Sequence, residues 1–229
     1  MDAFKTKRFH VRLFKKERRM NYQLSKENIL NKKSDCLCLP LYKSEEDKDG
    51  KLCPQGQQID AQLSQAISAL IVQFNISGEI GKTHLLPITS DKTQRILFLG
   101  LGESEKLTKS VFRKAAKSLA STLKDTNIES LAVDLSKVEL TDSQDAEADT
   151  ASEIVLAIEE SNYAFDQFKS KKSTPSSLSG IIFHSENTDI EASIKKAQAL
   201  SAGMSFTKDL GNMPGNICTP IYLAEQSEE

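Results

Sequence analysis

Histidine and cysteine are the side chains that most readily act as catalytic bases, nucleophiles or metal ligands. The three histidines, His10, His84 and His184, are scattered along the chain, and neither an H-E-x-x-H nor a G-x-S-x-G pattern accompanies them. His84 and His184 border apolar stretches, so we interpret them as structural side chains. The histidines therefore predict no catalytic pair and no metal site.

The cysteines also lack the paired spacing of a zinc site. Cys36 and Cys38 alternate within an apolar run, which predicts two buried thiols on one face of a strand, whereas Cys53 and Cys218 stand alone. The chain has no secretory pattern and no apolar run as long as a membrane span. Reduced thiols and a cytoplasmic location fit this sequence.

Two glycine motifs are similar to parts of phosphate-binding loops. Gly81-Lys82-Thr83 matches the end of a P-loop, but Ile76 occupies the place of the first glycine, and the predicted helix precedes the motif instead of following it. Gly100-Leu101-Gly102 follows a predicted strand, but Glu105 replaces the third glycine of a dinucleotide-binding turn. We interpret the first motif as a connecting turn and the second as close backbone packing, with a nucleotide site at the second as the alternative.

Residues 208–225 contain the most informative pattern. Thr219-Pro220 predicts the start of a helix, with a capping hydroxyl followed by proline at the first helical position. About ten residues follow, and Glu225, Glu228 and Glu229 place negative charge where the helix dipole disfavours it. A helix this short is marginal. We therefore expect the helix, and the domain that it opens, to continue in the ancestral protein.

The same segment resembles a family signature. Residues 209–218, DLGNMPGNIC, followed by Tyr222-Leu223-Ala224, resemble the DL-x-N-x-P-x-N signature that opens the catalytic domain of leucyl aminopeptidases, the cytosol aminopeptidase family of two-metal exopeptidases. Residues 163–169, YAFDQFK, resemble the YxFDxxK stretch of the family's interdomain region, and residues 95–102, RILFLGLG, resemble a strand and glycine turn of its N-terminal domain. The resemblance spans about residues 20 to 229.

The resemblance implies an N-terminal α/β domain of macro-like fold, a connecting helix, and a C-terminal domain that holds two divalent metals, Zn or Mn, to activate water. In the family, the metal-binding lysine and acidic residues and an N-T-D-A-E-G-R segment come after the signature. The resemblance therefore assigns no catalytic, cofactor-binding or metal-binding residue to this chain.

The function implied is that of the N-terminal portion of a leucyl-aminopeptidase-like metalloexopeptidase, which removes N-terminal amino acids from peptides and is inactive as this portion alone. One alternative is a non-catalytic module that binds a nucleotide or ADP-ribose at strand ends. Another is a hexamer assembly domain. The expected partners are peptides, as substrates of the complete enzyme, and either further copies of the chain or a complementing C-terminal fragment.

The charge is unevenly distributed. Residues 1–19 hold eight Lys or Arg and two acidic residues, so this basic arm carries +6, whereas the remainder carries −8. An acidic body disfavours nucleic-acid binding except through the arm, and no membrane partner is expected. Apolar residues interleave with the basic ones, which fits a phosphate-binding tail or an interfacial segment. The other interpretation is that translation begins at Met20.

The hydrophobic periodicity alternates between strand and helix. Strands are expected at 36–41, 83–88, 94–101, 130–135 and 180–184. Helices are expected over 59–74, 112–123, 151–172 and 190–211. Because only five residues separate the second strand from the third, these two should pair antiparallel. The fold class predicted is a three-layer α/β/α arrangement with a mixed sheet, followed by an incomplete second α/β domain.

The predicted domains follow from these elements. Residues 1–19 form the basic arm, 20–147 the macro-like domain, 148–177 a connecting helix with a polar linker, and 178–229 the beginning of the catalytic domain. The last unit has too few elements to bury a core alone.

Overall fold

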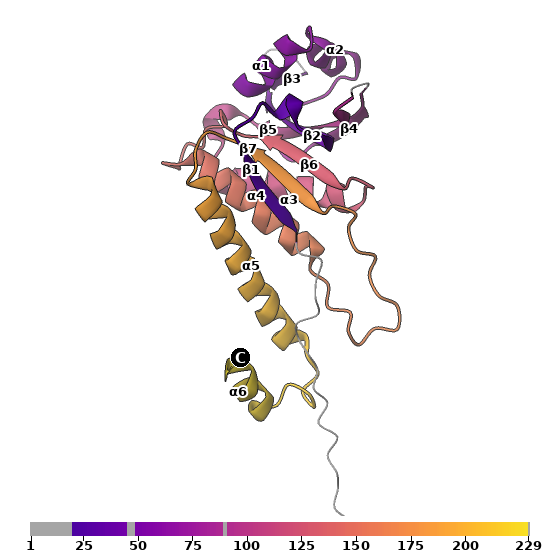
Figure 1. Cartoon of the computed structure of the whole chain (residues 1–229), viewed down its shortest axis with the longest axis vertical. Helices are drawn as coiled ribbons and strands as arrows, with labels where there is room; N and C mark the ends of the chain where they lie inside the picture. Colours follow the sequence, from indigo (N-terminus) through magenta and orange to yellow (C-terminus); the bar gives the residue numbers. More distant parts are fainter. Residues whose placement is uncertain (1–19, 45–48, 89–90, 229) are drawn as a thin grey trace, which may run out of the picture.

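A computed structural model describes residues 20–44, 49–88 and 91–228, and its seven described strands form one sheet (Figure 1). The order across the sheet is β1-β7-β6-β2-β5-β4, and β3 pairs with the end of β2. In this spatial order, β1, β7, β6, β2 and β5 are parallel to one another. β3 is antiparallel to β2, and β4 is antiparallel to β5. The strands are β1 (Asn21–Ser25), β2 (Ser34–Lys43), β3 (Gly50–Leu52), β4 (Thr83–Pro87), β5 (Thr93–Gly102), β6 (Ser130–Asp134) and β7 (Gly180–His184).

Helices cover both faces of this sheet, which confirms the predicted three-layer α/β/α arrangement with a mixed sheet. On one face lie α1 and α2; on the other lie α3 and α4, with α5 packed beside α4 and against β1 (Figure 1). The helices are α1 (Pro54–Gln62), α2 (Ala66–Gln73), α3 (Lys109–Lys124), α4 (Ala146–Asn162), α5 (Ile190–Asn212) and α6 (Pro220–Glu228), with short 3-10 turns at Ile29–Asn31 and Ser104–Lys106. Among the described residues, no helix combines the length and apolar character needed to cross a membrane.

The central strand β2 shows why a buried sheet reads as a continuous apolar run. Cys36 and Cys38 point into the core under α3 and α4, and Leu37 and Leu39 point into the core under α1 and α2. All four side chains are buried, because helices cover both faces of the strand. The prediction that the two thiols are buried together on one face is confirmed.

The predicted pairing of the two strands around residue 90 is also confirmed. β4 and β5 are antiparallel, with Leu85 opposite Leu97 and Leu86 opposite Ile96. A connection of five residues is too short for the crossover that parallel strands require. The antiparallel pairing therefore follows from the length of the connection alone.

The helix predicted over 59–74 is instead two helices, α1 and α2. Ser64 and Gln65 interrupt it with positive φ angles of 55° and 62°. The carboxylate of Asp60 accepts hydrogen bonds from the N–H groups of Ile67 and Ser68 at 2.8 and 3.2 Å, which satisfies donors at the start of α2. The helical prediction was wrong at this break because hydrophobic spacing does not reveal a side chain that caps from the preceding helix.

The helix predicted over 151–172 also ends early, since α4 stops at Asn162 and residues 163–179 have no regular structure. Phe165 therefore does not continue the helical stripe; its ring packs against Phe168 at 5.7 Å between centroids. The helix ends where Tyr163 adopts an extended backbone conformation. Its side chain contacts α5 instead, as described below.

The strand β7 differs from the prediction that a new unit begins at residue 178. β7 pairs with β1 on one side and β6 on the other, so it is an interior strand of the same sheet. Ile181 and Phe183 are buried in the core under α3 and α4. A lone five-residue strand cannot bury its apolar face by itself, so it joins the existing sheet. The other predicted boundaries, 1–19, 20–147 and 148–177, stay predictions.

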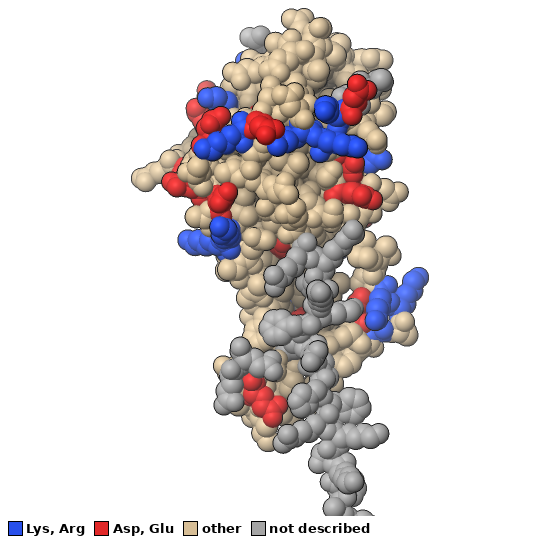
Figure 2. Space-filling view, in the orientation of Figure 1, with Lys and Arg blue, Asp and Glu red and all other residues tan. Residues whose placement is uncertain are grey.

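Ion pairs join α3 to α4. Arg113 makes two hydrogen bonds to the carboxylate of Glu153, at 2.7 and 2.9 Å. Lys109 contacts Asp149 at 2.6 Å, and although burial opposes ionisation of Asp149, the hydrogen bonds from Lys109 and Ser143 hold its pKa below the usual value. On the face shown in Figure 2, basic and acidic side chains lie beside one another in the same way. This visible face is of mixed sign, unlike the basic stripe of a nucleic-acid site.

Candidate functional site

The carboxyl ends of the parallel strands form the edge where open α/β sheets usually bind ligands. Asp134, at the end of β6, lies opposite His184, at the end of β7. The Nε2 atom of His184 is 4.0 Å from Oδ2 of Asp134, and the other oxygen of this carboxylate accepts hydrogen bonds from the N–H and hydroxyl groups of Ser136. The sheet therefore brings together two side chains that lie 50 residues apart in the sequence.

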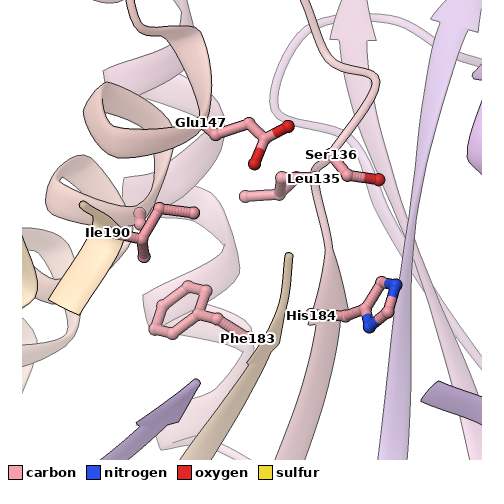
Figure 3. A pocket seen from close by; sticks show the side chains of 7 residues that line it. Leu135, Ser136, Glu147, Phe183, His184 and Ile190 are labelled. Atoms are coloured by element: carbon pink, nitrogen blue, oxygen red, sulfur yellow. The ribbon is translucent and has the colours of Figure 1, made fainter. Parts of the chain in front are cut away.

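A small pocket opens beside these residues (Figure 3). It is lined by Leu135, Ser136, Glu147, Phe183, His184 and Ile190, with Ala151. Figure 3 shows Phe183 and His184 pointing to opposite faces of β7, as the alternation of a strand requires. Glu147, in the first turn of α4, accepts a hydrogen bond from the hydroxyl group of Ser185.

The size of this pocket limits what it could bind. Its volume of about 10 Å³ is on the order of what a single water molecule needs. Drug-sized ligands occupy pockets of roughly 300–1,000 Å³. Two buried atoms at this edge, Nδ1 of His184 and Oε1 of Gln55, have no hydrogen-bond partner among the described residues. The arrangement fits a solvated polar cluster at the sheet edge, and it is too small for a nucleotide.

A second, open groove lies between β1 and the first half of α5. Its volume is about 390 Å³, and Tyr22, Leu24, Ile194 and Lys195 are among its lining residues. The hydroxyl group of Tyr22 donates to Glu159 of α4 at 2.9 Å, and burial, together with that carboxylate, raises the pKa of Tyr22 well above its usual value. The phenol is therefore held protonated as a structural donor.

The space beside the glycine pair at the end of β5 is occupied by the protein's own backbone. The N–H of Gly100 donates to the carbonyl of Lys82 at 2.8 Å, and the N–H of Gly102 donates to the carbonyl of Gly78 at 2.8 Å. A Cβ atom on Gly100 would lie 1.9 Å from the carbonyl oxygen of Glu79. Residues 78–82 thus cover the turn, in agreement with close backbone packing, and a ligand there would have to displace them.

The motif Gly81-Lys82-Thr83 is a connecting turn, as predicted. Gly81 has a φ angle of 73°, and its N–H donates to the carbonyl of Gly100 at 2.9 Å. Thr83 begins β4, and its hydroxyl group lies 2.9 Å from that of Thr122 on α3. The N–H of Gly81 is thus used in pairing with β5, and the N–H of Lys82 donates to the carbonyl of Glu79 at 3.0 Å, so both amides are already occupied within the protein.

The remaining predicted side chains are dispersed. His84 lies on β4 opposite Phe98, far along the sheet order from His184, and His10 falls outside the described residues. Cys53 is buried at the start of α1, and Cys218 is half-buried before α6. Over residues 20–44, 49–88 and 91–228, no three His, Cys, Asp or Glu side chains are grouped to hold a metal ion.

The two family-like segments, which the sequence could not connect, meet in space. The hydroxyl group of Tyr163 donates to Oδ1 of Asp209 at 2.9 Å and accepts from Nδ2 of Asn212 at 3.2 Å. The ammonium group of Lys208 lies 5.1 Å from the centre of the Tyr163 ring. Tyr163, Asp209 and Asn212 belong to the two family-like segments, and Lys208 directly precedes the second of them, but nothing in the spacing of these residues indicated the contact. The predicted cap at the next helix is confirmed, since Thr219 accepts from the N–H of Tyr222 at 3.2 Å.

The buried thiols lead to a prediction about reactivity. Burial raises the pKa of Cys36 and of Cys53 to about 12 and that of Cys38 well above 9.0. With Ellman's reagent at pH 8, we expect Cys218 to react first and the other three thiols only as fast as the chain unfolds. Because the folded pKa values are raised, the buried thiols favour the folded state only while they are protonated. Their contribution to the free energy of unfolding is fully present below pH 9 and is lost as the pH rises toward 12.

A Cys218→Ser variant is the control for that experiment. It should remove the fast phase and leave the slow phase unchanged. Fast labelling of two or more thiols in the native chain would contradict the buried positions of Cys36, Cys38 and Cys53.

Sequence comparison relates the chain to known proteins. A family model described as the cytosol aminopeptidase family, N-terminal domain, matches residues 39–172. The chain is 32% identical over 213 residues to a probable cytosol aminopeptidase of Haemophilus influenzae (strain PittEE), a match that covers 91% of this chain and 41% of that protein. It is 30% identical over 217 residues to a probable cytosol aminopeptidase of Stutzerimonas stutzeri, covering 92% of this chain and 42% of the relative.

Solved structures share the fold. A mutant of the tomato leucine aminopeptidase superposes with a TM-score of 0.70 at 24% identity, over 92% of this chain and 41% of that one. The bottromycin maturation enzyme BotP gives a TM-score of 0.61 at 18% identity, over 85% and 36%. The chain thus spans about two fifths of the length of these relatives, and it matches their N-terminal part. Since the family model matches more than half of its residues, this chain belongs to the cytosol aminopeptidase family.

Proposed function

We propose that this chain serves as the N-terminal portion of a leucyl-aminopeptidase-like enzyme that removes N-terminal amino acids from peptides. The observation that carries the proposal is the match of residues 39–172 to the N-terminal domain of the family. In this role the chain supplies the sheet domain and the helices α5 and α6 that follow it. The chemistry belongs to the part of the enzyme that follows the matched region in the relatives.

The metal requirement of the family does not fit the described residues. A two-metal hydrolase needs several carboxylate or nitrogen ligands within a few ångströms of each other. The described part of this chain contains no group of three His, Cys, Asp or Glu side chains suited to a metal. We therefore assign no step of hydrolysis to these residues, and we propose that two Zn or Mn ions bind outside this portion.

The proposal includes the setting in which the enzyme works. We place it in the cytoplasm, which agrees with the name of its relatives, cytosol aminopeptidases, and with the free thiols of all four cysteines. We propose that the sheet domain is macro-like, and that it assembles either with further copies, as a hexamer, or with a complementing C-terminal fragment. Size-exclusion chromatography with light scattering distinguishes a hexamer from a one-to-one complex.

The test is an assay of leucine release from a leucyl substrate in the presence of Mn²⁺ or Zn²⁺. The purified chain alone should give no metal-dependent turnover, because the ligands that it contributes are too few. Co-expression with the part of the Haemophilus influenzae relative that follows the matched region should give turnover that EDTA abolishes. The control is that same part expressed alone, which should be less active or insoluble.

Two outcomes would contradict the proposal. Robust, metal-dependent turnover by the chain alone would show that the chemistry lies within it. A folded and co-purifying complex without activity would show that this chain does not serve as the N-terminal portion of such an enzyme.

A further inference from the structure

The helix α5 is anchored along only half of its length. Ile190, Ile194, Ala197 and Ser201 are buried against the sheet domain, whereas none of the described residues 202–212 is buried. Figure 1 shows this second half extending beyond the sheet toward α6. About three turns of helix with no buried side chain are marginal in water. The direction of α5 must therefore depend on a few specific contacts.

Those contacts gather on a single phenol. Tyr163 lies directly after α4, and its hydroxyl group bonds to Asp209 and Asn212, which are three residues apart and so share one face of α5. Lys208 lies over the face of the same ring at 5.1 Å, a cation–π geometry. One aromatic side chain thus holds the last turn of α5 from two directions, through its hydroxyl group and through its ring.

The segment that carries Tyr163 is itself held in shape. Oδ2 of Asp166 accepts hydrogen bonds from the N–H and hydroxyl groups of Ser173, at 3.0 and 3.2 Å. Nε2 of Gln167 lies 3.9 Å from the sulfur of Met213, the buried residue that ends α5. Residues 163–173 therefore form an ordered loop that contacts the end of α5 through Tyr163 and Gln167.

We propose that Tyr163 is the positioning residue that fixes the direction in which α5 leaves the sheet domain. The two family-like segments, 163–169 and 209–218, supply the two sides of this contact. By holding Asp209 and Asn212, the phenol sets the start of the turn at residues 213–219 and the placement of α6. This role concerns the geometry of the chain and stands independently of the proposed hydrolysis.

The test is hydrogen–deuterium exchange, read by mass spectrometry, on the full chain with Tyr163→Phe. This variant keeps the ring and its contact with Lys208 but removes the hydroxyl group. We expect exchange of the amides in residues 205–213 to rise about tenfold, because a hydrogen bond to a charged group is lost. The melting temperature should change little, since none of the residues 202–212 is fully buried.

A matched control is available in Tyr22, whose hydroxyl group also donates to a carboxylate at 2.9 Å, that of Glu159. Tyr22→Phe removes the same kind of bond from the interior of the sheet domain. It should affect protection in β1 and α4 and leave residues 205–213 unchanged. The conservative variant Asp209→Asn keeps an acceptor for the phenol and should raise exchange less than Asp209→Ala.

The proposal is overturned if Tyr163→Phe exchanges like the wild type in residues 205–213, or if Tyr22→Phe raises exchange there equally. It is also overturned if Asp209→Asn and Asp209→Ala are equivalent, since a positioning hydrogen bond requires the acceptor. Circular dichroism of each variant establishes that the fold is intact before the exchange is compared.

Discussion

Replacing Gly100 with alanine is expected to destabilise the chain by about 3 kcal/mol or more. The added Cβ would lie 1.9 Å from the carbonyl oxygen of Glu79, which is a backbone atom and cannot rotate away. The strand cannot move aside either, because the N–H of Gly100 donates to Lys82 and its carbonyl accepts from Gly81, and these two bonds tie it to the covering segment. The measurement is urea unfolding followed by far-ultraviolet circular dichroism.

The control for this change is Gly203→Ala, in the middle of α5, where an added Cβ meets nothing within 4 Å. That variant should be stabilised by about 0.5–1 kcal/mol, since alanine favours helix over glycine. A free energy of unfolding for Gly100→Ala within about 0.5 kcal/mol of the wild-type value is typical of neutral surface changes. That result would show that residues 78–82 do not pack against the turn.

The result bears on function as well as on stability. A glycine that serves a nucleotide leaves room for a phosphate beside its backbone. At Gly100 that room is taken by the chain, and the pocket at the ends of β6 and β7 has a volume of only about 10 Å³. The glycine here serves the close approach of two backbone segments, which favours the role of an enzyme portion over that of a nucleotide-binding module.

Replacing Arg113 with alanine should cost about 3 kcal/mol. Its partner Glu153 is only 2% exposed, so the change leaves a carboxylate buried without its counter-ion. Arg113 itself is 53% exposed. The reverse change, Glu153→Gln, lets the guanidinium turn toward water and should cost only about 1 kcal/mol. Thermal and urea unfolding of both variants measure this asymmetry.

The neighbouring pair Lys117–Glu160 is the matched control, because it links the same two helices at 3.0 Å with both side chains about half exposed. Lys117→Ala should cost less than about 0.5 kcal/mol, as surface pairs generally do. Equal effects for Arg113→Ala and Lys117→Ala would show that the burial of Glu153 does not decide the outcome.

The sequence alone determined the features that depend on neighbouring residues. The short connection at residues 88–92 required β4 and β5 to be antiparallel, and the apolar run at 36–41 indicated a strand with two buried thiols on one face. Thr219-Pro220 specified a helix start. The signature at 209–218 resembled that of the family because it is a local pattern of residue types, and the family model that matches residues 39–172 shows the same family.

Only the tertiary structure decided the features that depend on residues far apart in the chain. The insertion of β7 between β1 and β6, the capping of α2 by Asp60, and the contact of Tyr163 with Asp209 all join segments whose separation no periodicity encodes. The sheet edge likewise gathers Asp134 and His184 only after the strands have paired. The residue pattern of a short segment determines whether it forms a helix or a strand. Which of these helices and strands then pack together depends on the apolar faces that each of them still has to bury.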